Sequence, residues 1–252
     1  MKTILRAAVA LMFLAVTCLS AQAKFENETL HYVVRYKWGL VHKEAGDATV
    51  TLRNQGNKYK ITLTAKTRPW ADNIFRMRDT LISTVGVADF KAQSYSKIAH
   101  EDKTYTRDDI TFTYHDKVVM GSVKRHKIRK NGKESRTSKL LSSSGRTFDF
   151  LSVFYYVRML DYAKMKPGVA YKVSVFSGKM TETLAITCLK KGEIKLYNGK
   201  KANAWKLSFT FTSEGGKQSS DNIYAWVSPD AGHAIYKVVG SLPVGQIQVF
   251  LK

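Results

Sequence analysis

The chain has 252 residues, of which 44% are hydrophobic, and its formal net charge is +21 at pH 7. The hydrophobic fraction is sufficient for an apolar core. Beyond the N-terminal segment, no apolar stretch approaches the length of about 20 residues that a membrane-spanning helix needs, which excludes helical membrane spans there.

The N-terminus has the three parts of a secretory signal peptide. Lys2 and Arg6 give a positive start, an apolar run covers residues 7–19, and Ala21-Gln22-Ala23 provides the small residues that a signal peptidase accepts. This pattern predicts a cleavable signal peptide over residues 1–23 and an exported, periplasmic protein, with association with the outer membrane left open. A retained anchor and lipidation at Cys18 are the alternatives.

Cleavage leaves 229 residues with a net charge of +19, because the removed segment carries two basic residues and no acid. Only Cys188 remains, so no internal disulfide can form, and we expect this residue to be a buried small hydrophobe. Export argues against nucleic acid as the partner of a basic protein. Phospholipid headgroups, lipopolysaccharide phosphates and acidic glycans remain as anionic partners, and a solvated surface without a partner is the alternative.

Alternation of β-branched and aromatic residues with a period of two dominates the chain and predicts an antiparallel all-β protein. A two-residue hairpin turn is expected at Asn131-Gly132 and a longer turn at residues 39–46. We expect a curved sheet that forms a half-barrel, a barrel-like shape or a sandwich. The expected strands cover residues 30–38, 47–53, 59–67, 80–85, 94–100, 110–115, 118–130, 134–141, 170–176, 182–189, 193–197, 204–212, 222–227, 235–239 and 246–250.

One segment, residues 148–165, has the three-four spacing of an amphipathic helix. Thr147 or Asp149 is available as its N-cap, and Pro167-Gly168 ends it. A second, short helix is expected within residues 70–77. We expect a single β-rich domain over residues 24–252. The basic, serine-containing stretch 135–146 is the best candidate for a mobile connection, and two β halves joined near residues 135–148 are the alternative.

Several stretches together carry a family resemblance: YVVRYKWGLV at 32–41, AGDA at 45–48, WADNIFRMRDT at 70–80, FLSVFYYVR at 150–158, FSGK at 176–179, and AWVSPD at 225–230 continuing to Gly245. In order and spacing they are similar to a bacterial secreted family known only as domain of unknown function 3108. The resemblance covers nearly the whole chain after residue 23 and implies an envelope protein of Gram-negative type. It supplies no activity and no catalytic residues. The expected fold also looks like periplasmic lipoprotein-carrier half-barrels, which is an analogy of fold alone.

No enzyme signature is present in the sequence. His100-Glu101 lacks the second histidine of a zinc-protease motif, and neither a Gly-x-Ser-x-Gly elbow nor a Gly-rich phosphate loop occurs. Asp108 and Asp109 are adjacent on a strand, so their side chains point to opposite faces. The sequence therefore favours a protein without catalysis, cofactor or metal. An unrecognised hydrolase, in which His100 or His233 meets a nucleophile or a carboxylate, is the third alternative.

Three groups of residues are candidates for ligand binding. Cations on both faces of the hairpin around Asn131-Gly132 predict that it projects into solvent, where it either grips anionic headgroups or acts as a solubilising edge. Arg158 lies on the aromatic helix, where it either pairs with an acid such as Asp79 or Glu182 or binds an anion at a cavity mouth. Three tryptophans either belong to the core or line an apolar ligand cavity. The candidates are Lys124, Arg125, Lys127, Arg129, Lys130, Arg158, Trp38, Trp70 and Trp226.

These observations favour a binding or carrier protein for an anionic amphiphile, such as a lipid, lipopolysaccharide or a lipoprotein. The curved sheet and helix would hold the apolar part, and a basic rim would hold the head. An envelope module that docks a protein or a glycan through exposed sheet edges is the alternative. The sequence does not give the oligomeric state.

Overall fold

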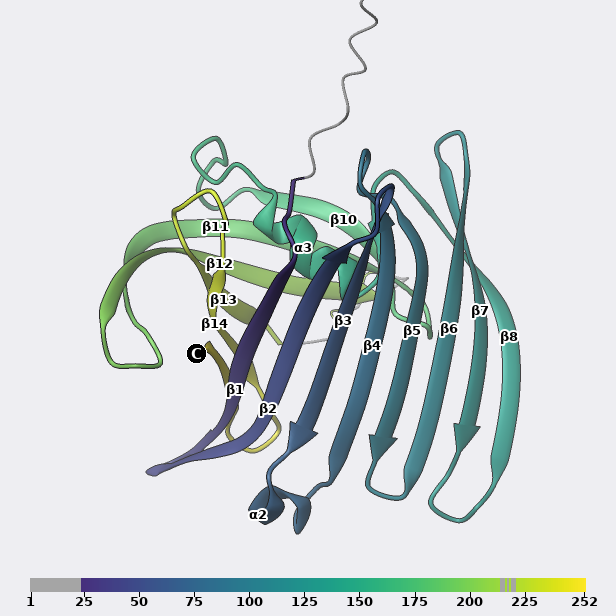
Figure 1. Cartoon of the computed structure of the whole chain (residues 1–252), viewed down its shortest axis with the longest axis horizontal. Helices are drawn as coiled ribbons and strands as arrows, with labels where there is room; N and C mark the ends of the chain where they lie inside the picture. Colours follow the sequence, from purple (N-terminus) through teal and green to yellow (C-terminus); the bar gives the residue numbers. More distant parts are fainter. Residues whose placement is uncertain (1–23, 214–215, 217, 219–220) are drawn as a thin grey trace, which may run out of the picture.

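The computed structural model describes residues 24–213, 216, 218 and 221–252, so the expected signal peptide lies outside the described residues. Within them, fifteen strands form one sheet, in the order β8-β7-β6-β5-β4-β3-β2-β1-β15-β14-β13-β12-β11-β10-β9 (Figure 1). All neighbours are antiparallel except β9 and β10, and β1 pairs with β15. The all-β, antiparallel prediction is confirmed.

The elements have the following bounds. The first strands are β1 (Glu28–Trp38), β2 (Val41–Asn54), β3 (Lys58–Thr67), β4 (Met77–Gly86), β5 (Ala92–Glu101), β6 (Thr104–His115), β7 (Val118–Ile128) and β8 (Glu134–Ser144). The others are β9 (Thr147–Phe148), β10 (Ala170–Phe176), β11 (Thr181–Lys195), β12 (Lys201–Ser213), β13 (Ile223–Val227), β14 (Ile235–Ser241) and β15 (Gln246–Leu251). The helices are α2 (Pro69–Asp72) and α3 (Ser152–Arg158).

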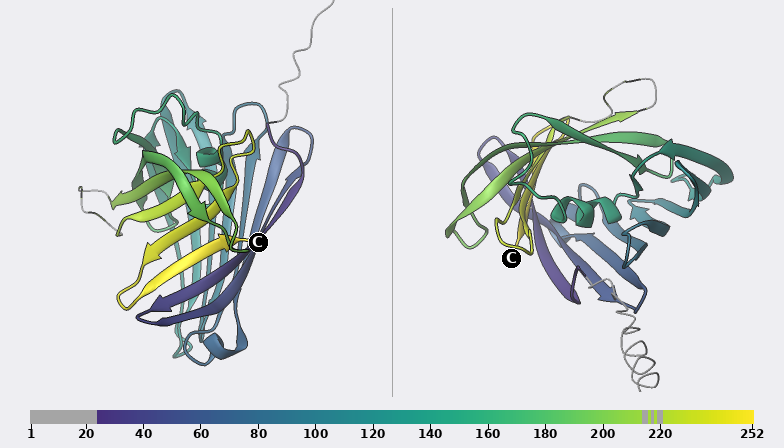
Figure 2. Two further views of the ribbon diagram at one scale, coloured as in Figure 1. Left: turned by 90° about the vertical axis from the view of Figure 1, so that its left-hand side faces the viewer. Right: turned by 90° about the horizontal axis from the view of Figure 1, so that it is seen from above.

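The sheet curls until its two ends nearly meet, and α3 lies inside the resulting barrel-like shape (Figure 2, right). At the junction, Thr181 Oγ1 donates a hydrogen bond to the Ser142 carbonyl at 3.1 Å. The fully buried Phe176 ring stacks on Phe112, with centroids 5.4 Å apart. Gly121 makes room for it, because a Cβ at this position would lie 2.5 Å from Phe176 Cδ2.

The core lies between α3 and the concave face of the sheet. Phe25, Tyr59, Phe90 and Tyr155 pack ring against ring, with centroids 5.1–6.3 Å apart. Cys188 is buried, as predicted. Because α3 and these rings fill the middle of the barrel, room for a ligand has to be sought at its ends.

Three local expectations about the strands are wrong. The turn expected at residues 39–46 is only Gly39-Leu40, because β2 begins at Val41 and accommodates Gly46 at a bulge where a Cβ would lie 2.7 Å from Lys66 O. The strands expected at 182–189 and 193–197 are one strand, β11, with a bulge that preserves its pairing with β12. The expected connection at 135–146 is strand through residue 144, since β8 pairs with β7 along its length.

The expected helix at 148–165 is much shorter, and its N-cap is Leu151, without a side-chain cap bond, instead of Thr147 or Asp149. Asp149 lies in the turn just before the helix. Asp149 Oδ1 accepts hydrogen bonds from the backbone N–H groups of Leu151 and Ser152, both at 2.8 Å. The helix ends at Arg158, where side chains from outside the helix donate hydrogen bonds to its last carbonyl oxygens. The Tyr162 hydroxyl donates to Val157 O, and His233 Nδ1 donates to Arg158 O.

Candidate functional site

A cavity of about 830 Å³ opens at one end of the barrel. Its wall comes from three chain reversals, between β4 and β5, β6 and β7, and β8 and β9, together with Lys24 and Met159. These reversals lie close together because the strands alternate in direction and neighbouring hairpins turn at the same end of the sheet.

The inner part of the cavity is apolar. Phe90, Val119 and Phe148 are buried side chains of the core that also face the cavity. The Phe148 ring stacks on Tyr156 at 4.5 Å between centroids, which fixes its orientation. Burial raises the pKa of Tyr114, so its hydroxyl stays neutral while it donates to Ala92 O at 2.7 Å.

The mouth of the cavity carries more cations than acids. Lys91 lies 3.5 Å from Asp89, Lys24 Nζ donates to Met159 O at 3.2 Å, and the Arg146 guanidinium lies 5.5 Å from the Tyr156 ring centroid. The four cations, which we call the cavity rim, are Lys24, Lys91, Lys117 and Arg146, and the acids beside them are Asp89 and Asp116. The rim is thus positive by two charges and stands beside an apolar floor.

Sequence reasoning did not find this cavity. Its residues come from segments 87–91, 114–119 and 144–148, which are far apart in the chain. Each segment has an ordinary turn composition with one lysine or arginine. Only the pairing of the strands shows that these cations belong to one mouth.

Arg158 does not face this cavity. Its guanidinium is 3% exposed, pairs with Glu28, and donates through Nη2 to Gly232 O at 2.9 Å. It also lies 5.2 Å from the Phe25 ring centroid and 5.0 Å from that of Tyr155. Burial acts to lower the pKa of Arg158, but the hydrogen bonds and charge of Glu28 outweigh it and raise this pKa. The acid partner is therefore Glu28, not Asp79 or Glu182 as expected.

The three candidate tryptophans lie apart from one another. Trp38 is exposed at the end of β1, and Trp70 in α2 donates Nε1–H to Glu44 O at 2.7 Å. Trp226 lies on the outer face of β13, between the ammonium groups of Lys206 at 5.4 Å and Lys237 at 5.3 Å from its ring centroid. The structure does not bring them together around one apolar cavity.

The candidate cations of the β7–β8 hairpin also disperse, because their side chains alternate between the two faces of β7. Lys124 lies on the outer face. Arg125 points inward to the buried Asp108, with two hydrogen bonds of 2.5 Å. Lys127 and Lys130 line a different depression. Arg129 begins the tight turn between β7 and β8, and its backbone N–H donates to Lys133 O. As β8 ends the sheet, its cations also fit the solubilising-edge alternative.

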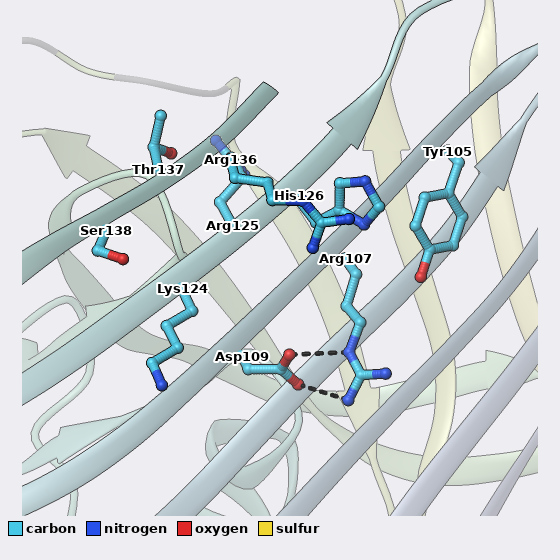
Figure 3. Close-up of a pocket in the computed structure, with 9 residues that line it drawn as sticks. All are labelled: Tyr105, Arg107, Asp109, Lys124, Arg125, His126, Arg136, Thr137 and Ser138. Carbon is cyan, nitrogen blue, oxygen red and sulfur yellow. Dashed lines mark hydrogen bonds and ion pairs between the residues drawn. The ribbon is translucent and has the colours of Figure 1, made fainter. Parts of the chain in front are cut away.

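A basic groove of about 530 Å³ lies on the outer face of β6, β7 and β8 (Figure 3). Arg107 pairs with Asp109 at 2.8 Å, and Lys124 lies beside this pair. Arg136 and His126 both contact Glu134, at 2.8 Å and 2.9 Å. Since carboxylates already pair most of these cations, the groove presents less free charge than its composition suggests.

The histidines named in the hydrolase alternative make structural contacts. The His100 ring packs on Tyr105 at 5.0 Å, and the His233 ring on Tyr162 at 4.9 Å between centroids. Among the described residues, no group of three His, Cys, Asp or Glu side chains is placed to hold a metal ion. In the same residues, no helix is long and apolar enough to cross a membrane.

These features define a barrel-like β protein with an amphiphilic cavity at one end. The chain belongs to the family described as protein of unknown function DUF3108, whose profile matches residues 31–252. No curated protein matches it. A solved structure from Brucella abortus, a beta-barrel-like protein of domain of unknown function DUF1849, is similar with a TM-score of 0.61 and 10% identity, over 90% of this chain and 96% of that chain. At this identity the likeness concerns the fold alone.

Proposed function

We propose that this protein binds an anionic amphiphile in the cavity at the end of the barrel and acts as a non-enzymatic binding or carrier protein. One observation carries the proposal: an apolar floor, including Phe90 and Phe148, lies directly inside a rim with two more cations than acids. The signal-peptide pattern of residues 1–23 supports action outside the cytoplasm.

The energetics of the cavity favour a ligand with an apolar and an anionic part. Burial of a hydrocarbon chain against the floor contributes about 25 cal/mol per Å² of apolar surface removed from water. A volume of about 830 Å³ lies within the usual range for small-molecule sites, about 300–1,000 Å³. An anionic headgroup beside Lys117 and Arg146 would be attracted by both cations. Within the described residues, neither of them forms an ion pair with a carboxylate.

Calorimetry with a single-chain probe tests this function. Dodecyl phosphate, used below the concentration at which it aggregates, is expected to bind more tightly than dodecyl maltoside, which has the same chain and no charge. The double substitution Lys117→Gln and Arg146→Gln is expected to lower the affinity for dodecyl phosphate about tenfold. The reason is that two partly exposed charge contacts together contribute about 1–2 kcal/mol to binding. Binding of the maltoside should stay within about twofold.

A matched pair of substitutions separates the cavity rim from general charge. Lys60→Gln and Lys66→Gln remove the same charge from exposed positions of β3 and should leave both affinities unchanged. The assignment of the cavity as the amphiphile site would be contradicted by either of two results. One is an equal loss of affinity for dodecyl phosphate in this control, and the other is equal affinity of the wild type for the two probes.

A further inference from the structure

The opposite end of the barrel is built from five chain reversals that are neighbours in the sheet. The strand order places β14–β15, β1–β2, β3–β4, β5–β6 and β7–β8 side by side, and antiparallel pairing puts these reversals at the end away from the cavity. They run along the lower edge of the molecule, with α2 between β3 and β4 (Figure 1). We call this edge the lower rim.

Three neighbouring reversals of the lower rim expose large apolar side chains. In the β1–β2 turn, Trp38 is 59% exposed and Leu40 is fully exposed. In the β14–β15 turn, Leu242 and Val244 are 41% and 57% exposed. Behind α2, Ile74 and Phe75 are 78% and 43% exposed. Single exposed apolar residues are ordinary, whereas a group of this kind marks a contact surface.

Specific contacts hold these three reversals next to one another. Tyr36 Oη donates a hydrogen bond to Val244 O at 3.0 Å. Gly245, with φ +81°, comes so close to β1 that a Cβ would lie 2.5 Å from Lys37 O. On the other side, the bond from Trp70 to Glu44 O ties α2 to β2. The β14–β15 turn is therefore fixed against β1, and α2 is fixed against β2, so the three apolar tips keep their places along the lower rim.

Cations flank and continue this surface. Lys43 Nζ lies 4.3 Å from the Trp70 ring centroid, where β2 lies beside α2. A depression of about 620 Å³ beside Ile74 and Phe75 is lined by four cations and three acids, namely Arg76, Lys103, Lys127, Lys130, Asp72, Glu101 and Asp102. The β7–β8 turn adds further exposed cations, Arg129 and Lys133. Along the lower rim, an apolar part thus passes directly into a basic part.

We propose that the lower rim docks onto a lipid surface that contains anionic headgroups. Trp and Leu side chains at loop tips suit the boundary between headgroups and acyl chains, where an indole ring has both apolar and polar surroundings. The lysines beside them attract anionic lipids. A second copy of this chain fits less well, because two lower rims would bring like charges together. The proposal does not depend on the amphiphile cavity.

Vesicle flotation with residues 24–252, which contain every described strand and helix, tests this surface. The protein is expected to float with vesicles of phosphatidylglycerol and phosphatidylcholine, and less with phosphatidylcholine alone. Trp38→Ser with Leu40→Ser is expected to lower partitioning at least tenfold on both vesicles. Lys127→Gln with Lys130→Gln is expected to remove the preference for phosphatidylglycerol while binding to phosphatidylcholine persists.

Val169→Ser with Tyr171→Ser is the matched control, because these exposed residues, 49% and 40%, lie outside the lower rim. It should change partitioning less than twofold. Bromine-labelled acyl chains should quench tryptophan emission, and Trp38→Phe should remove most of that quenching while the protein still floats, because Trp38 is the most exposed tryptophan of the lower rim. Three results would overturn the proposal. They are an equal loss of partitioning in the control, quenching that Trp38→Phe leaves undiminished, and a dimer of the protein that only Trp38→Ser with Leu40→Ser disperses.

Discussion

At the scale of single residues, two glycines decide how closely the ends of the sheet approach each other. Gly121 leaves room for the Phe176 ring, and Gly178, with φ +80°, lies where a Cβ would be 3.1 Å from Asp108 Oδ2. Phe176 and Gly178 belong to the FSGK stretch of the family resemblance. We infer that this stretch closes the barrel, because it brings the β10–β11 hairpin against β6 and β7.

Gly121→Ala is therefore expected to destabilise the fold. The new methyl group would collide with a fully buried ring, and overpacking of this kind costs about 1–3 kcal/mol in the free energy of unfolding. Urea unfolding followed by circular dichroism measures this loss. Gly192→Ala is the control, since Gly192 lies in β11 with nothing within 4 Å of the added methyl. Equal stability of the two variants would show that Gly121 does not limit the approach of Phe176.

Asp149 and Arg158 differ in how far their contacts could be predicted from the sequence. A local role for Asp149 at the start of α3 was predictable, because its partners are the next backbone N–H groups along the chain, although the N-cap itself is Leu151. The pairing of Arg158 with Glu28 was not, since the two residues are 130 positions apart and meet only after the barrel has formed. A buried arginine needs an acidic partner, and this much could be expected from the sequence. Which acid it pairs with depends on the fold.

At the scale of elements, an ion-pair network ties β2 to the end of β3 and to the C-terminal residue. Arg68 donates through Nε and Nη2 to the two Asp47 carboxylate oxygens at 2.8 Å and 2.9 Å, and through Nη1 to Glu44 at 2.5 Å. Lys252 Nζ lies 3.3 Å from Asp47 Oδ1. The hydrogen bonds from Arg68 lower the pKa of Asp47 to about 2.

This pKa predicts part of the response to acid. An unfolded aspartate has a pKa of about 4, so the folded state holds fewer protons at Asp47 between pH 4 and pH 2. The stabilisation is complete above about pH 4 and disappears as the pH falls to about 2. Unfolding midpoints in urea should therefore converge for the wild type and Asp47→Asn as the pH drops through this interval. A difference between them that stays constant from pH 5 to pH 2 would contradict the network.

The strands themselves were predictable because a period of two is a local signal. The alternation also predicted that cations would appear on both faces of the β7–β8 hairpin, and they do: Lys124 lies outside and Arg125 inside. Local patterns did not reveal what each face meets. Arg125 is neutralised by Asp108, while Lys127 and Lys130 join the lower rim.

At the scale of the whole molecule, the two ends of the barrel have different chemistry. One end holds a cavity with an apolar floor and a cationic rim, and the other presents apolar tips beside lysines. Such an arrangement suits a protein that meets a lipid surface at one end and holds an amphiphile at the other. The all-β class followed from the sequence, whereas both ends depend on which hairpins become neighbours when the sheet closes.

The most direct test of the amphiphile site is a crystal structure of residues 24–252 with dodecyl phosphate. We predict that the alkyl chain lies against Phe90, Phe148 and Met159, with the phosphate within hydrogen-bonding distance of Lys117 or Arg146. A cavity that stays empty while the ligand lies elsewhere on the barrel, at a concentration that saturates binding in solution, would contradict this account.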